Sequence, residues 1–284
     1  MCFKLTLPDE IIDKIKSYVI FTPKNRDELN FAIHLWCTKI KTAHKRYHHI
    51  SLWNTKYITN MSYLFYLRSN FNSVISSWNV SNVTNMEGMF MFASMFNQKL
   101  SNWDVSMVTC MSLMFNHAKS FNQPLNNWNV SKVLDMSGIF RDAISFNQSL
   151  DNWNVSKVEN MENMFMEAKS FNKSLNNWNV SNVENMRHMF YFAESFNQPL
   201  NEWNVSNVED MLGMFANSYK FNQPLNNWDV SNVFDFSYMF SHAQSFNQNI
   251  SNWNIKNEPY MSNIFMRATS FNKKLHWNKL FESE

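Results

Sequence analysis

The sequence predicts an α/β solenoid of about nine 25-residue strand–helix units, preceded by an α-helical head. Three observations lead to this fold class. A tryptophan recurs every 25 residues from Trp53 to Trp253, and a phenylalanine keeps the same period from Phe71 to Phe271. Within each period the apolar spacing changes from two residues to three or four. A fixed period of this length is typical of stacked supersecondary units that share a continuous core.

The first part of each unit carries the period of a β-strand. Around the fourth tryptophan the chain reads LNNWNVSKV, in which Trp128 and Val130 are two residues apart with Asn129 between them. Alternation of this kind places Trp128 and Val130 on the inner face of a strand and Asn129 on the outer face.

The second part of each unit has helical spacing. Val183, Met186, Met189, Phe190 and Ala193 follow one another at intervals of three, three, one and three residues. Such spacing predicts a short helix with one buried face. An Asn or Asp usually precedes the first Met, where an N-cap would accept a backbone N–H group. Each unit is therefore expected to be a strand, a turn, a short helix and a return loop.

An asparagine follows every recurring phenylalanine, from Asn72 to Asn272. Its amide can hydrogen-bond backbone groups of its own unit and reach the next one. We expect a ladder of stacked amides along the solenoid. A row of ligand contacts is the alternative.

Residues 1–49 do not follow the repeat and form the predicted head. LPDEIIDKIKSYVI places Pro8 in a first helical turn with isoleucines on one face. Asn25 and Glu28 read as the capping box of a second helix. The expected organisation is a head at 1–49, the repeats at 50–278 and a tail at 279–284.

The repeat motifs resemble two kinds of known repeat. L-x-x-W-x-V-x-x-V resembles the leucine-rich-repeat signature, and FNQPLNNWNVSNV followed by NMxxMF resembles the BspA-type repeats of bacterial surface proteins and lipoproteins, a domain of unknown function. The resemblance covers roughly residues 50–278. It implies a right-handed, leucine-rich-repeat-like solenoid.

The head resembles an F-box. LPDEIIDKI at residues 7–15, followed by a helix with LWC at 35–37, carries this resemblance. It implies an adaptor that recruits a host ubiquitin ligase by binding a Skp1-like protein. Such heads on repeat bodies occur in large DNA viruses, so a viral protein is one interpretation. The head residues expected to bind are Leu7, Pro8, Ile11, Ile12, Ile15 and Trp36. The alternative is that the head only caps the solenoid.

The composition favours binding over catalysis. With 3 Gly the chain has little material for a glycine-rich phosphate loop, and no nucleophile–base or metal-ligand pattern stands out. We therefore expect no enzyme activity, cofactor or metal. A net charge of +2 argues against nucleic acid. No apolar stretch is long enough to span a membrane, and no secretory signal is evident, so the expected location is the cytoplasm, of a host cell if viral, or the virus particle.

The outward Asn or Asp beside each Trp forms the expected partner-binding face of the repeats. Short, nearly uncharged side chains suit an extended peptide, a protein or a glycan. The alternative is a structural, surface or particle-associated protein whose repeats build a rigid rod. The oligomeric state stays open. The residues of this row are Asn79, Asp104, Asn129, Asn154, Asn179, Asn204 and Asp229.

Overall fold

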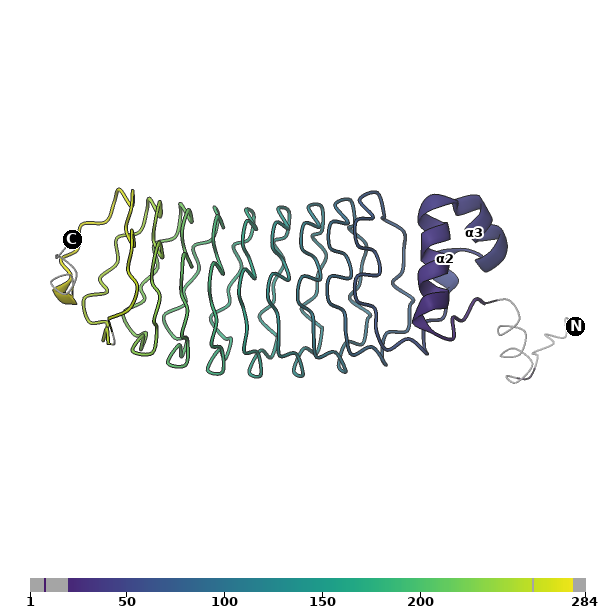
Figure 1. The fold of residues 1–284 in the computed structure, drawn as a ribbon, viewed down its shortest axis with the longest axis horizontal. Helices are drawn as coiled ribbons and strands as arrows, with labels where there is room; N and C mark the ends of the chain where they lie inside the picture. The colour runs from purple at the N-terminus through teal and green to yellow at the C-terminus, as the bar shows by residue number, and fades with distance from the viewer. Residues whose placement is uncertain (1–7, 9–19, 257, 278–284) are drawn as a thin grey trace, which may run out of the picture.

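The computed structural model describes residues 8, 20–256 and 258–277. They form a rod of stacked coils, each one 25-residue period long, with two helices at the N-terminal end (Figure 1). Helix α2 spans Arg26–Thr38, helix α3 spans Ile40–Tyr47, and the short 3₁₀ helix η1 spans Ile50–Leu52. The capping box is confirmed in part, because the backbone N–H of Glu28 donates to Oδ1 of Asn25 at 3.0 Å.

The expectation of a leucine-rich-repeat-like α/β solenoid of strands and helices is wrong. Only 10% of the structure is helical and 3% is strand. In the described part of the chain the coils contain no helix and no extended sheet. Parallel pairing is limited to isolated bridges between equivalent residues of neighbouring coils, beginning with Asn60 and Asn85 and ending with Asp235 and Tyr260.

The expected helix of each unit is a series of overlapping β-turns. The N–H of Ile139 donates to the Met136 carbonyl at 3.2 Å, and the N–H of Arg141 donates to the Gly138 carbonyl at 3.1 Å. Gly138 has a φ of 56° and Asp142 has a φ of 52°, which an α-helix excludes. Successive turns return an inward side chain every three residues. The apolar spacing therefore predicts the buried face correctly, but the helix that it also predicts is wrong.

The turns leave every second N–H free to reach the next coil. The N–H of Gly138 donates to the Glu162 carbonyl at 2.7 Å, and that of Phe140 donates to the Met164 carbonyl at 3.0 Å. Intervening residues use their N–H within the coil. This segment satisfies its backbone groups without becoming a helix or a regular strand.

The expected strand has the predicted alternation but no strand ladder. Trp128 and Val130 are buried and Asn129 is exposed. The N–H of Trp128 closes a turn onto the Leu125 carbonyl at 3.0 Å. The contact between coils here comes from the indole, because Trp128 Nε1 donates to the Leu100 carbonyl at 3.0 Å. The same bond recurs along the rod, for example from Trp153 to Leu125.

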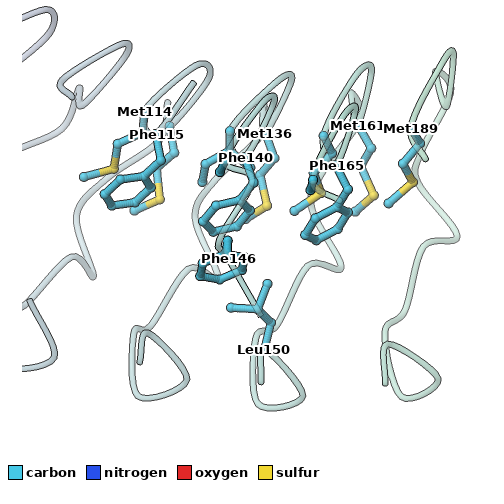
Figure 2. Packing of buried hydrophobic residues seen from close by; sticks show 14 of the residues in the cluster. Met114, Phe115, Met136, Phe140, Phe146, Leu150, Met161, Phe165 and Met189 are labelled. Atoms are coloured by element: carbon cyan, nitrogen blue, oxygen red, sulfur yellow. The ribbon is translucent and has the colours of Figure 1, made fainter. Parts of the chain in front are cut away.

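The core consists of aromatic stacks that run along the rod. Phe140 lies 5.7 Å from Phe165 between ring centroids and 3.9 Å from Phe146 of its own coil. Figure 2 shows Phe115, Phe140 and Phe165 in register, with methionine side chains beside them. The indoles stack as well, with Trp153 and Trp178 at 6.4 Å and nearly parallel. The two separations between coils lie in the range in which aromatic pairs attract.

The predicted asparagine ladder is confirmed. Oδ1 of Asn122 accepts the backbone N–H of Asn147 at 3.0 Å and the side-chain amide of Gln148 at 2.9 Å. The backbone bond repeats from Asn72 to Asn272. The recurring Asn therefore has a structural role, since it links each coil to the one before it.

The described part of the head packs onto the first coil. Helix α2 buries Leu29, Ala32, Ile33 and Trp36 against the same core as the coils. Trp36 lies 6.0 Å from Trp53 between ring centroids. The guanidinium of Arg26 donates to the Ser62 carbonyl. The carbonyl at the equivalent position of later coils accepts a backbone N–H of the preceding coil. These contacts are those of a cap.

Replacing Trp178 with alanine is expected to lower the free energy of unfolding by about 3–5 kcal/mol. The indole is buried, stacks on Trp203 and donates to the Leu150 carbonyl. Trp178→Phe, which keeps a ring but loses the hydrogen bond, should cost less. Urea denaturation measures both variants, and wild-type stability for Trp178→Ala would show that the indole does not hold the coils together.

Replacing Asn122 with alanine is expected to cost about 1–3 kcal/mol, because it leaves the N–H of Asn147 without its acceptor. Asn129→Ala is the matched control. Its exposed side chain bonds only the same local turn, at Ser131. We expect that change to cost about 0.5 kcal/mol or less. Equal losses of stability in the two variants, measured by thermal unfolding, would contradict the ladder.

Candidate partner-binding surfaces

The predicted partner-binding row beside the tryptophans is exposed, but its acceptor oxygens are engaged. Oδ1 of Asn129 accepts the backbone N–H of Ser131 at 3.2 Å and its hydroxyl at 2.7 Å. The backbone bond recurs at every residue of the row: Asn79, Asp104, Asn129, Asn154, Asn179, Asn204 and Asp229. Asn and Asp are the side chains that make such turns. The turn alone therefore accounts for the composition of this row.

The same turns act on the pKa of the two acids of the row. Hydrogen bonds from the hydroxyl and the N–H of Ser106 lower the pKa of Asp104, and Ser231 lowers that of Asp229 in the same way. Beside the row, Asn127, Asn129, Asn152 and Asn154 border a shallow hollow of ≈ 360 Å³. It is lined by asparagines and the edge of Trp128, with no charged side chain among its lining residues.

The predicted head site is only partly described. Leu7, Ile11, Ile12 and Ile15 lie outside the described residues. Pro8 is exposed. Trp36 is buried at the junction with the coils, where its Nε1 donates to Ser73 Oγ at 3.0 Å. This packing leaves little of Trp36 for a partner. Binding of a Skp1-like protein stays a prediction.

A second surface is formed by positions at which the residue type changes from one unit to the next. It consists of the residues that stand nine, ten, thirteen and fourteen positions after each Trp from Trp53 to Trp253, and we call it the turn face. Some of them, such as Tyr66 and Tyr238, are exposed, and others, such as Asn116 and Ser241, are buried. At fourteen residues the chain carries Leu67, Phe92, His117, Asp142, Glu167, Phe192, Asn217, His242 and Arg267. At ten residues it carries Tyr63, Gly88, Leu113, Gly138, Asn163, His188, Gly213, Tyr238 and Asn263.

The turn face is built on left-handed backbone. All residues ten and fourteen after these tryptophans have a positive φ, from 52° to 60°. Glycine and asparagine adopt this conformation at little cost, whereas bulky side chains do so rarely. Several of the bulky ones are exposed, among them Leu67 at 59% and Tyr238 at 41%. The fold therefore fixes the backbone conformation at these positions but does not dictate which side chain stands there.

Aromatic side chains of the turn face form pairs, both between neighbouring coils and within one coil. The ring of Phe92 lies 4.2 Å from that of His117 in the next coil between centroids, and His188 lies 5.2 Å from Tyr191 of its own coil. The three glycines of the chain sit where such neighbours need room. A Cβ on Gly138 would stand 2.8 Å from Leu113, and one on Gly213 would stand 2.5 Å from His188. Large residues therefore lie over the glycine of the next coil.

One charged cluster on the turn face is internally paired. Asp142 is 8% exposed, and its Oδ2 lies 3.4 Å from both His117 Nε2 and Lys119 Nζ. Nδ1 of His117 meets Oδ1 of Asn116. Burial lowers the pKa of His117, although the Asp142 carboxylate opposes that change. These contacts hold the ring in one orientation beside Phe92.

Sequence reasoning missed the turn face because it searched for regularity. The row beside the tryptophans repeats in every unit, so it stood out. The signal of the turn face is the opposite one, namely positions whose residue changes from unit to unit while the surrounding frame stays constant.

Among the residues that the structure describes, no group of three or more His, Cys, Asp or Glu side chains could hold a metal ion. No helix there is long and apolar enough to cross a membrane.

The chain matches one family model over most of its length. Residues 38–143, 124–218 and 199–281 each match the family described as "Mycoplasma protein of unknown function, DUF285". The overlapping matches agree with an array of equivalent coils. No curated protein and no solved structure matches the chain.

His188 is expected to make stability depend on pH. Burial lowers its pKa from 6.5 to about 4, and Arg187 and Arg141 add to the effect. The unfolded chain therefore binds the proton more tightly, and stability is full above pH 6.5 and falls as the pH drops towards 4. Urea denaturation of the wild type and of His188→Gln at pH 7 and pH 5 measures this. The variant should lose less stability between the two values, and an identical loss would contradict the assignment.

Proposed function

The chain belongs to the DUF285 family of Mycoplasma proteins of unknown function, and from this premise we propose that it is a non-catalytic scaffold that binds a protein partner through the turn face. The family carries no function of its own to transfer. The proposal therefore rests on the geometry of this chain.

The observation that carries the proposal is the presence of bulky side chains on left-handed backbone. A residue other than glycine held in such a region costs on the order of 1–3 kcal/mol. Phe92, Phe192 and Leu67 occupy a position where Asn217 of another coil shows that a less strained residue fits the same turn. Strain of this kind is typical of functional surfaces, because stability alone would select glycine or asparagine.

The residue types of the turn face support a protein partner. Tyrosine, tryptophan and arginine side chains supply most of the binding energy in protein interfaces. They gather here, for example in Tyr63 and Tyr66 at 5.8 Å and in Tyr191 and Phe192 at 4.8 Å between ring centroids. The row beside the tryptophans offers short amides with an engaged Oδ1. The turn face is therefore the better candidate for a specific interface.

Site-specific photocrosslinking tests the proposal. A photoreactive phenylalanine analogue is placed at Tyr66, Tyr191 or Tyr238 on the turn face, and at Asn129 or Asn179 as matched controls on the row beside the tryptophans. After irradiation in cell extract, crosslinked proteins are identified by mass spectrometry. We expect the same discrete protein from the turn-face positions and none from the controls.

Variants then separate the two surfaces. Binding of the purified crosslinked protein should fall by about tenfold or more in the double variant Tyr191→Ala and Tyr238→Ala, since each truncated hot-spot residue costs about 1–2 kcal/mol or more. The triple variant Asn129→Arg, Asn154→Arg and Asn179→Arg should keep wild-type affinity. The reverse pattern would place the interface on the row beside the tryptophans and contradict the proposal.

A further inference from the structure

A groove of ≈ 430 Å³ lies between the end of helix α2 and the first coil. Trp36, Cys37 and Ile40 line it from the head, and Arg68, Asn70 and Asn72 line it from the coil. It is separate from the turn face except at Leu67, which borders both. The head contacts the first coil beside this groove, where Trp36 lies 6.0 Å from Trp53 between ring centroids and its Nε1 donates to Ser73 Oγ.

This corner is where the hydrogen-bond ladders begin. In the next coil the N–H of Asn97 donates to Oδ1 of Asn72, and the N–H of Met95 donates to the Ser69 carbonyl. In the part of the chain that the structure describes, the head and not a coil precedes the first coil. Among the residues that the structure describes, none accepts from the N–H of Asn70 or of Asn72. Both groups belong to lining residues of the groove.

The groove also holds an unpaired positive charge. Arg68 is half-buried, and in the described part of the chain its guanidinium makes no hydrogen bond or ion pair. Its charge reaches the thiol of Cys37, whose pKa burial raises and Arg68 partly lowers. At the rim stand two exposed apolar side chains, Ile40 at 55% and Leu67 at 59%.

We propose that this groove binds an acidic segment of a protein partner, with an Asp or Glu carboxylate in the place that the Asn Oδ1 of a preceding coil would occupy. Two backbone N–H donors and a guanidinium suit a carboxylate, which accepts such charge-assisted hydrogen bonds strongly. The apolar rim suits aliphatic residues that flank the acid. The ligand class follows from the ladder, because in later coils the N–H equivalent to that of Asn72 binds a side-chain oxygen and the N–H equivalent to that of Asn70 binds a carbonyl oxygen, as in Asn97 and Met95.

The architecture favours a ligand over simple solvation of this corner. Trp36 Nε1 donates to Ser73 Oγ. At the position equivalent to Ser73, most later coils have a glutamine whose side-chain amide donates to an Asn of the ladder. The head is thus anchored beside the N–H groups of Asn70 and Asn72, and its described residues accept from neither. The donors are consequently held in place before binding, which reduces the entropy that a ligand must overcome.

Peptide binding to the full-length protein tests the inference. The probe is acetyl-Leu-Asp-Leu-amide, whose only carboxylate is the Asp side chain, and the control is acetyl-Leu-Asn-Leu-amide. Titration is followed by ¹H–¹⁵N NMR. The amide protons of Asn70 and Asn72 should move downfield with the Asp peptide, whereas that of Asn97, already bonded within the ladder, should not. The Asn peptide should bind about tenfold or more weakly, since hydrogen bonds to a charged group are worth about 1.5–3 kcal/mol.

The variant Arg68→Gln should weaken binding of the Asp peptide by about tenfold or more and leave the melting temperature unchanged. Lys157→Gln, which removes an exposed positive charge of a later coil outside the turn face, is the matched control and should bind like the wild type. Failure of the Asp peptide to bind, equal affinity for the two peptides, or unchanged affinity in Arg68→Gln overturns the proposal. None of these results bears on the turn face.

Discussion

Hydrogen bonds between neighbouring coils, repeated at each period, are the constraint on which the rest of the structure depends. A coil with no helix and no regular strand cannot satisfy its own backbone, and burial of unpaired N–H or carbonyl groups is costly. The chain meets this demand in three ways, through alternate N–H groups of the turns, through the indole N–H of each Trp, and through the amide of each Asn that follows Phe. The 25-residue period is strict because each donor must meet its acceptor one coil away.

The aromatic core follows from the same constraint. Coils held in register by hydrogen bonds place identical side chains above one another, so planar rings can stack along the rod. Phe165 and Phe190 at 5.6 Å, or Trp178 and Trp203 at 6.4 Å, show the result. Methionine fills the remaining space beside the rings, because its flexible thioether adapts to an irregular backbone.

The sequence predicts the period, the buried positions and the amide ladder, because these depend on which side chains recur and at what distance. It does not predict the conformation between them. Met186, Met189 and Ala193 have the spacing of a helix, yet a series of β-turns also returns a residue to the core every third position. Left-handed residues such as Phe192 and Glu167 carry no local signal for a positive φ. For the same reason the turn face could not be located from the sequence, whereas the exposure of Asn129 could.

The equivalence of contacts along the rod has a consequence for how such a chain can change over generations. Since Asn97 meets Asn72 as Asn147 meets Asn122, an unequal crossover that duplicates or removes one whole period rejoins matching partners at the new junction. The length of the protein can therefore drift in whole periods while each junction keeps its bonds. Point substitutions at the left-handed positions alter the surface without disturbing that frame. The length of the rod and the side chains on its surface can thus change independently of each other.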